Sequence, residues 1–192
     1  MTGPLDTGTW RWARSCATWM FDAPLSPGAP PAEAIAACAR GALAALPGFA
    51  SPAVAEWTTA SAGDGAAVQP RGAPIDAQTV DAILRAHPDL IALTLALDLA
   101  VAAPDGSEAT LADAAVLHIE LEDDMVVLWL SLHVDLYARR TFGAERDNDP
   151  LAGRNAPRLS GFLARLVETT GMHFDSVSAP SYDDQATPRG FA

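Results

Sequence analysis

The segment AAVLHIELEDDMVVLWLSLHVDLY, residues 114–137, decides the fold predicted for this chain. It contains two stretches in which bulky apolar residues occupy alternate positions, Ala114–Glu122 and Met125–Tyr137, and an Asp-Asp pair separates them. A period of two is typical of strands that bury one face. If the aspartates form a tight turn, Leu117 lies opposite Leu130 and the aliphatic rows of both strands share one face. The segment therefore predicts a β-hairpin.

The reverse face of this hairpin gathers the side chains of most functional interest. In the same register His118 lies opposite Trp129, and the second strand continues on that face with His133, Asp135 and Tyr137. Aromatic side chains among polar ones often anchor protein interfaces, although a second layer of helix packed over them explains the pattern equally well. The two histidines, His118 and His133, do not form one compact site. His118 lies opposite Trp129, and four residues of strand, roughly 13 Å, separate Trp129 from His133.

Three more segments are predicted to be strands. In Leu90–Val101 every odd-numbered residue is a bulky aliphatic one, which predicts a strand with one bulky and one thin face. Thr9–Phe21 also alternates, although some of its apolar residues fit one helical face as well. A short strand is predicted near Val54–Thr58.

Three segments are predicted to be helices. Glu33–Leu46 follows two prolines that suit a first helical turn. A second helix runs from its cap at Asp76 to about Ala86. In the last, Asn155 caps a helix that has Pro157 in its first turn and Gly171 just past its end.

These elements predict a single α+β domain over residues 1–174. Its single antiparallel sheet has about four to five strands, and its helices pack mainly on one face. The segment Ser61–Pro74 is rich in glycine and proline and is predicted to be a mobile surface loop. Residues 175–192 contain little to bury and are predicted to be a flexible tail.

The chain is acidic, with a formal net charge of -12 over 192 residues. Affinity for nucleic acid comes largely from basic side chains, so nucleic acid is excluded as the expected partner. Half of the 24 acidic residues fall between Asp98 and Asp149. A protein that meets this region is therefore expected to be basic.

No cofactor, metal centre or membrane span is predicted. Cys16 and Cys38 are the only thiols, too few for a zinc site, and are expected to be buried and reduced. The longest apolar stretch, Leu90–Ala103, contains Asp98 and is shorter than the roughly 20 residues that cross a bilayer. No secretory signal is visible at the amino terminus, so the expected location is the cytoplasm.

A partner-binding surface is predicted around the turn of the hairpin, its reverse face and the connection that follows. That connection could instead bind calcium through Asp147 and Asp149, but the calcium-loop pattern is incomplete, and solvated ion pairs are the simpler explanation. The residues of the predicted surface are Glu120, Glu122, Asp123, Asp124, Trp129, His133, Asp135, Tyr137, Arg139 and Arg146.

From Ala114 to Gly171 the order of hairpin, DLYARRTFG, RDNDPLAGRNAPRL and terminal helix resembles small acidic bacterial proteins of the polymorphic-toxin immunity type. The resemblance covers less than a third of the chain and transfers no functional residue. It implies a non-enzymatic factor that occludes a toxin with an acidic surface.

Three functions remain open from the sequence. The first is this inhibitor or immunity-type binding of a basic protein. The second is a secretion-type chaperone or assembly adaptor, because small acidic α+β proteins often act as dimers of that kind. The third is a small-ligand or metal-dependent enzyme that uses the face with His118 and His133. The oligomeric state is not determined by the sequence.

Overall fold

The computed structural model describes residues 15–61, 66–140 and 148–192. Its three helices are α1 (Pro31–Ala45), α2 (Ala77–Ala86) and α3 (Asp149–Thr170). Its strands are β1 (Ala17–Pro24), β2 (Ala50–Thr59), β3 (Ala67–Gln69), β4 (Leu90–Ala102), β5 (Glu108–Glu122), β6 (Met125–Leu132), β7 (His173–Ser178), β8 (Ala186–Thr187) and β9 (Gly190–Phe191).

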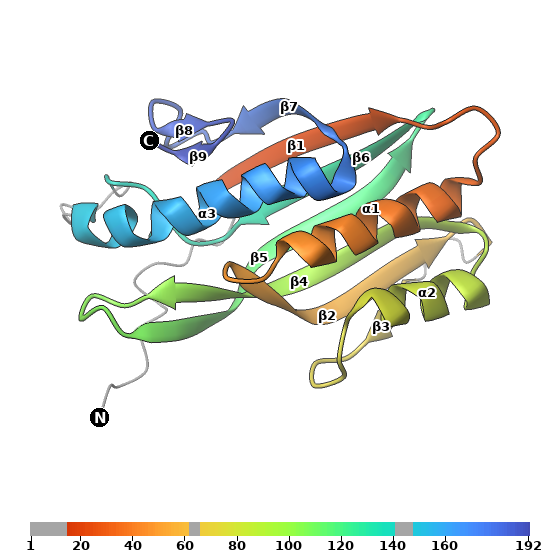
Figure 1. Ribbon diagram of the computed structural model, residues 1–192, viewed down its shortest axis with the longest axis horizontal. Helices are drawn as coiled ribbons and strands as arrows, with labels where there is room; N and C mark the ends of the chain where they lie inside the picture. Colours follow the sequence, from red (N-terminus) through yellow and green to blue (C-terminus); the bar gives the residue numbers. More distant parts are fainter. Residues whose placement is uncertain (1–14, 62–65, 141–147) are drawn as a thin grey trace.

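Seven of these strands form one antiparallel sheet in the order β3-β2-β4-β5-β6-β1-β7, and β8 pairs with β9 in a separate ribbon. All three helices lie on the same side of the sheet, with α1 and α3 side by side across its centre (Figure 1). The odd-numbered residues of β4 point towards them and are buried, from Leu93 to Val101. The core therefore lies between the sheet and the helices, and the other face of the sheet has no helix on it among the described residues.

The predicted hairpin is confirmed in its register. Leu117 pairs with Leu130 and Ile119 pairs with Leu128 across β5 and β6, and all four side chains are buried. Asp123 turns the chain with a φ of 52°, in the left-handed region that aspartate tolerates better than most residues. The sequence of this segment therefore fixes both the pairing and the buried face.

The predicted sheet of four to five strands is wrong, because the sheet has seven. The two additional strands are the edge strands. β3 has only three residues and lies inside the predicted loop Ser61–Pro74, and β7 lies at the start of the predicted tail. Edge strands are short and largely exposed, so their sequences lack the strong alternation that marks β4, β5 and β6.

The segment 175–192 takes part in the fold. β7 pairs with β1, and the chain beyond it buries Tyr182 and Phe191. The ring of Phe191 lies edge-on to the buried indole of Trp19, with 5.6 Å between centroids. Trp19 Nε1 also donates a hydrogen bond of 2.8 Å to the carbonyl of Thr187. Two aromatic side chains and one indole donor thus hold a segment that is otherwise polar.

Helix α3 begins at Asp149, six residues before the predicted start at Asn155. Asn155 is not a cap but a fully buried residue within the helix. Pro157 lies inside the helix as well, and Gly171 ends it with a φ of 69°, as predicted. The predicted start was wrong because asparagine followed by proline matches a helix start, while the true role of Asn155 depends on a distant strand.

Gly41 of α1 allows a close approach of α3. A Cβ at this position would lie 2.7 Å from the main-chain oxygen of Thr169, whose hydroxyl donates to the Gly41 carbonyl at 2.8 Å. Alanine usually stabilises a helix relative to glycine, but here we expect Gly41→Ala to lower the free energy of unfolding by about 1–3 kcal/mol, because main-chain atoms must move.

The matched control is Gly153→Ala in α3, where a Cβ would meet nothing within 4 Å. This change is expected to raise the free energy of unfolding by about 0.5 kcal/mol. Urea denaturation of both variants measures the contrast. A stabilising effect of the same size at both positions would contradict the close contact between α1 and α3.

Candidate functional site

The candidate site is the face of the sheet on which none of the helices of the described residues lies, here called the uncovered face. A row of large side chains crosses its centre, since Met20 of β1 pairs with Trp129 of β6, and Trp129 pairs with His118 of β5. The rings of His118 and Trp129 are 5.4 Å apart between centroids. His118 Nδ1 lies 2.6 Å from the hydroxyl of Thr94, and His118 Nε2 lies 3.1 Å from a carboxylate oxygen of Glu120. Neighbouring strands therefore hold the imidazole in place beside the indole.

A second row on the same face consists of small side chains without charge. It follows the strand pairing across six strands and is made of Ser178, Thr18, Ser131, Val116, Ala96 and Val54. None of these residues is fully buried. On this side of the row that contains Trp129, the face therefore carries small side chains without charge.

Carboxylates lie on the other side of the row that contains Trp129, near the turn between β5 and β6. Asp22 of β1 and Glu120 of β5 both lie opposite Val127 of β6. A hollow of about 230 Å³ at this end has an apolar floor and an acidic rim, and its lining residues are Met20, Asp22, Glu122, Asp123, Asp124, Met125, Val127 and Asp175. The charge of the face is thus concentrated at its hairpin end.

At the opposite end of the strands the acidic side chains are compensated. Arg71 Nη1 lies 2.5 Å from Asp98, and Arg71 Nη2 contacts Asp113. The main-chain N–H of Asp113 also donates to Asp98 at 2.9 Å. Because no basic side chain pairs with the carboxylates of the hollow within the described ranges, the negative potential of this face is strongest around the turn.

The structure brings together only part of the predicted surface. Glu120 and Trp129 lie on the uncovered face, and Glu122, Asp123 and Asp124 lie at its hairpin end, as expected. These five residues form one continuous region with Met20.

Asp135 and Tyr137 do not continue this face, and their predicted placement is wrong. β6 ends at Leu132, and His133 follows it half-buried. The side chains of Asp135 and Tyr137 are 2% and 0% exposed. Tyr182 donates to the Asp135 carboxylate at 3.5 Å, and the ring of Tyr137 packs near Phe49. Alternation continues in the sequence after Leu132, but the chain has already left the sheet.

The two arginines of the predicted surface lie elsewhere. Arg139 is exposed beside the start of α3, where its Nε is 3.6 Å from Asp149. Arg146 and the proposed calcium ligand Asp147 lie outside the described residues.

Three residues of the site, Met20, Asp22 and Asp175, were missed by the sequence analysis. Met20 and Asp22 project on the uncovered face because Trp19 and Phe21 point into the core. For Met20 the signal was the alternation of Thr9–Phe21, but the helical interpretation of the same residues left its outward position unassigned. Asp22 was missed because the segment from Asp22 to Pro31 was predicted to be a loop, whereas β1 runs to Pro24. Asp175 was missed because its segment was predicted to be a tail.

Apart from the contact of His118 with Glu120, the histidines and cysteines of the described residues lie apart from one another. His118 and His133 do not meet, and within residues 15–61, 66–140 and 148–192 no three His, Cys, Asp or Glu side chains are grouped so as to hold a metal ion. Cys16 and Cys38 are free and buried, as predicted. Burial raises the pKa of both thiols to about 12, so neither is a reactive thiolate at neutral pH.

Comparison of the chain with family models, curated proteins and solved structures finds no match. None of the helices in the described ranges is long and apolar enough to cross a lipid bilayer.

Proposed function

We propose that this chain is a non-enzymatic protein-binding factor of the inhibitor or immunity type, which binds a basic partner through the uncovered face of its sheet. The single observation that carries the proposal is the row of Met20, Trp129 and His118 on three adjacent strands, with carboxylates at its hairpin end. A large aromatic side chain at the centre of a surface and charged side chains at its rim are the usual anatomy of a protein interface.

The acidic end supplies the preference for a basic partner. Uncompensated carboxylates around Asp123 and Asp124 attract a basic surface over a Debye length of about 8 Å at physiological salt, which speeds association. The same charges oppose back-to-back pairing of two copies of this face, because each would bring its carboxylates towards those of the other copy. A basic protein is therefore the occupant that the charge distribution favours.

The test compares affinity capture by the wild-type chain, by Trp129→Ala and by a control, Val167→Ala. Val167 is an exposed apolar residue on α3, away from the uncovered face. We expect a basic protein to be captured by the wild type and by the control, and its dissociation constant to rise at least ~30-fold in Trp129→Ala, as for a central aromatic anchor.

A double charge reversal, Glu120→Lys with Glu122→Lys, tests the electrostatic part. We expect the association rate to fall about tenfold or more at low salt, and the difference to shrink as salt screens it. The proposal fails if no stoichiometric partner is captured, if the partner is acidic, or if Trp129→Ala and Val167→Ala weaken binding equally.

A further inference from the structure

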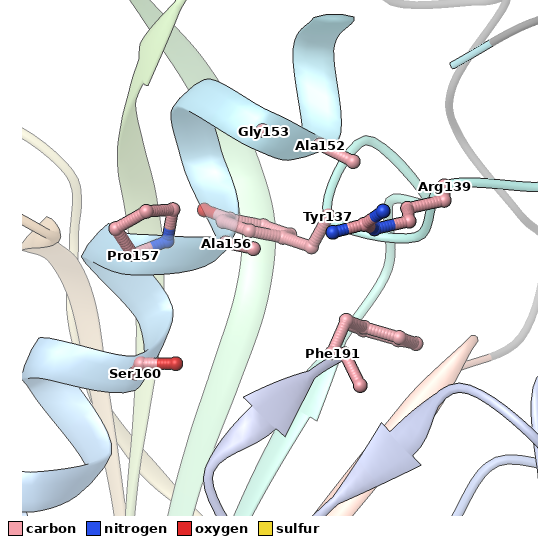
Figure 2. Close-up of a pocket in the computed structure, with 9 residues that line it drawn as sticks. Tyr137, Arg139, Ala152, Gly153, Ala156, Pro157, Ser160 and Phe191 are labelled. Atoms are coloured by element: carbon pink, nitrogen blue, oxygen red, sulfur yellow. The ribbon is translucent and has the colours of Figure 1, made fainter. Parts of the chain in front are cut away.

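A cavity of about 440 Å³ lies between the first half of α3, the segment after β6 and the ribbon strand β9. It shares no residue with the uncovered sheet face. Figure 2 shows its walls, with Tyr137 and Phe191 facing the helix residues Ala156, Pro157 and Ser160. Cavities of this size bind small molecules in many proteins.

The apolar walls of this cavity are held rigidly. Phe191 contacts the buried rings of Trp19 and Tyr182 edge-on, with centroid distances of 5.6 and 5.9 Å. Tyr137 is fully buried at its side of the cavity, with its ring 6.2 Å from that of Phe49. Since two aromatic rings and a proline are fixed before any ligand arrives, binding of a flat apolar group costs little ordering of the protein.

One cationic side chain, Arg139, lines this cavity. The guanidinium of Arg139 extends from its backbone towards Tyr137, over the space bounded by α3 and Phe191 (Figure 2). Its Nε lies 3.6 Å from Asp149, and no hydrogen bond joins its terminal amino groups to another of the described residues. The planar fork of a guanidinium matches the two oxygens of a carboxylate.

We propose that this cavity binds a small aromatic carboxylate, with its ring against Ala156, Pro157 and the edge of Phe191 and its carboxylate paired with Arg139. The apolar lining, backed by the rings of Tyr137 and Phe191, favours a flat apolar body, and Arg139 selects the acid over the corresponding amide. This site is independent of the binding of a basic protein, because Trp129 and the acidic turn take no part in it.

Calorimetric titration of the full chain with benzoate, 1-naphthoate and benzamide tests the proposal. We expect saturable binding of at least one carboxylate and no saturable binding of benzamide. Arg139→Gln should weaken the carboxylate about tenfold or more, and Ala156→Leu, which fills the cavity, should abolish binding. Arg140→Gln is the matched control, because Arg140 pairs with Asp184 and does not line the cavity.

Thermal unfolding of each variant shows whether it is folded, and a bound carboxylate should raise the midpoint of the wild type. The proposal is overturned if neither acid binds up to roughly 10 mM, a concentration at which even a millimolar site is largely filled. It is also overturned if benzamide binds as well as benzoate, or if Arg140→Gln weakens binding as much as Arg139→Gln. Each of these outcomes leaves the capture experiment on Trp129 unaffected.

Discussion

Replacing Asn155 with alanine is expected to lower the free energy of unfolding by about 2–4 kcal/mol. The Asn155 side chain accepts a hydrogen bond of 2.8 Å from the N–H of Ala102 and donates one of 3.0 Å to the carbonyl of the same residue. It also donates to the carbonyl of Leu151 at 3.0 Å. The amide thus completes the hydrogen bonding of the buried end of β4. Alanine leaves the N–H and the carbonyl of Ala102 without these partners at a buried position.

Substitution by aspartate adds a dependence on pH. In Asn155→Asp the carboxylate still accepts from the Ala102 N–H, but it faces the Ala102 carbonyl and is desolvated, so its pKa is expected to lie above the usual value of about 3.9. The folded variant then binds a proton more tightly than the unfolded chain. Its stability is therefore greatest below the unfolded pKa and falls as the pH rises through the folded pKa.

Urea denaturation at neutral and acidic pH measures both effects, with Glu168→Ala on the same helix as the control. Glu168 is exposed, so this change is expected to alter the free energy of unfolding by less than about 0.5 kcal/mol. If Asn155→Ala were as mild as Glu168→Ala, the amide would not be the support of β4 that the structure shows.

The role of Asn155 could not be predicted from the residues around it. Its neighbour Pro157 and its polarity match a helix start, whereas its partner Ala102 lies 53 residues away in the chain. Local patterns cannot reveal such a partner. The register of β5 and β6 was predictable for the opposite reason, because both strands and their turn lie within one short segment and alternate strongly.

The candidate site was predicted in part on the same basis. The pairing of His118 with Trp129 follows from the hairpin alone. Met20 joins them only because β1, which is distant in sequence, inserts beside β6. Asp135 and Tyr137 keep the alternation of a strand, but the chain leaves the sheet after Leu132, and its C-terminal segment covers Asp135 with Tyr182. Alternation in a sequence indicates which side chains point to opposite faces of a strand. It does not indicate the residue at which the strand leaves the sheet.

The exchange of Trp19 for alanine is expected to cost about 3–5 kcal/mol of unfolding free energy, the range for large buried aromatic side chains. Trp19 is 0% exposed, and its removal takes away the ring that Phe191 contacts and the donor to Thr187. Because Phe191 and Thr187 belong to the C-terminal ribbon, this segment should also lose its attachment to the sheet. Hydrogen exchange of residues 179–192 should then rise more than that of β5 and β6.

The same substitution at Trp129 is the control, since Trp129 lies on the adjacent strand but on the uncovered face. Trp129→Ala is expected to cost less than about 1 kcal/mol, because the indole is already partly in contact with water and leaves no closed cavity. Urea denaturation of the two variants therefore distinguishes a tryptophan that holds the fold from one that is available to a partner. Equal losses would mean that something covers Trp129 in the free protein, and both the sidedness of the sheet and the proposed binding surface would have to be given up.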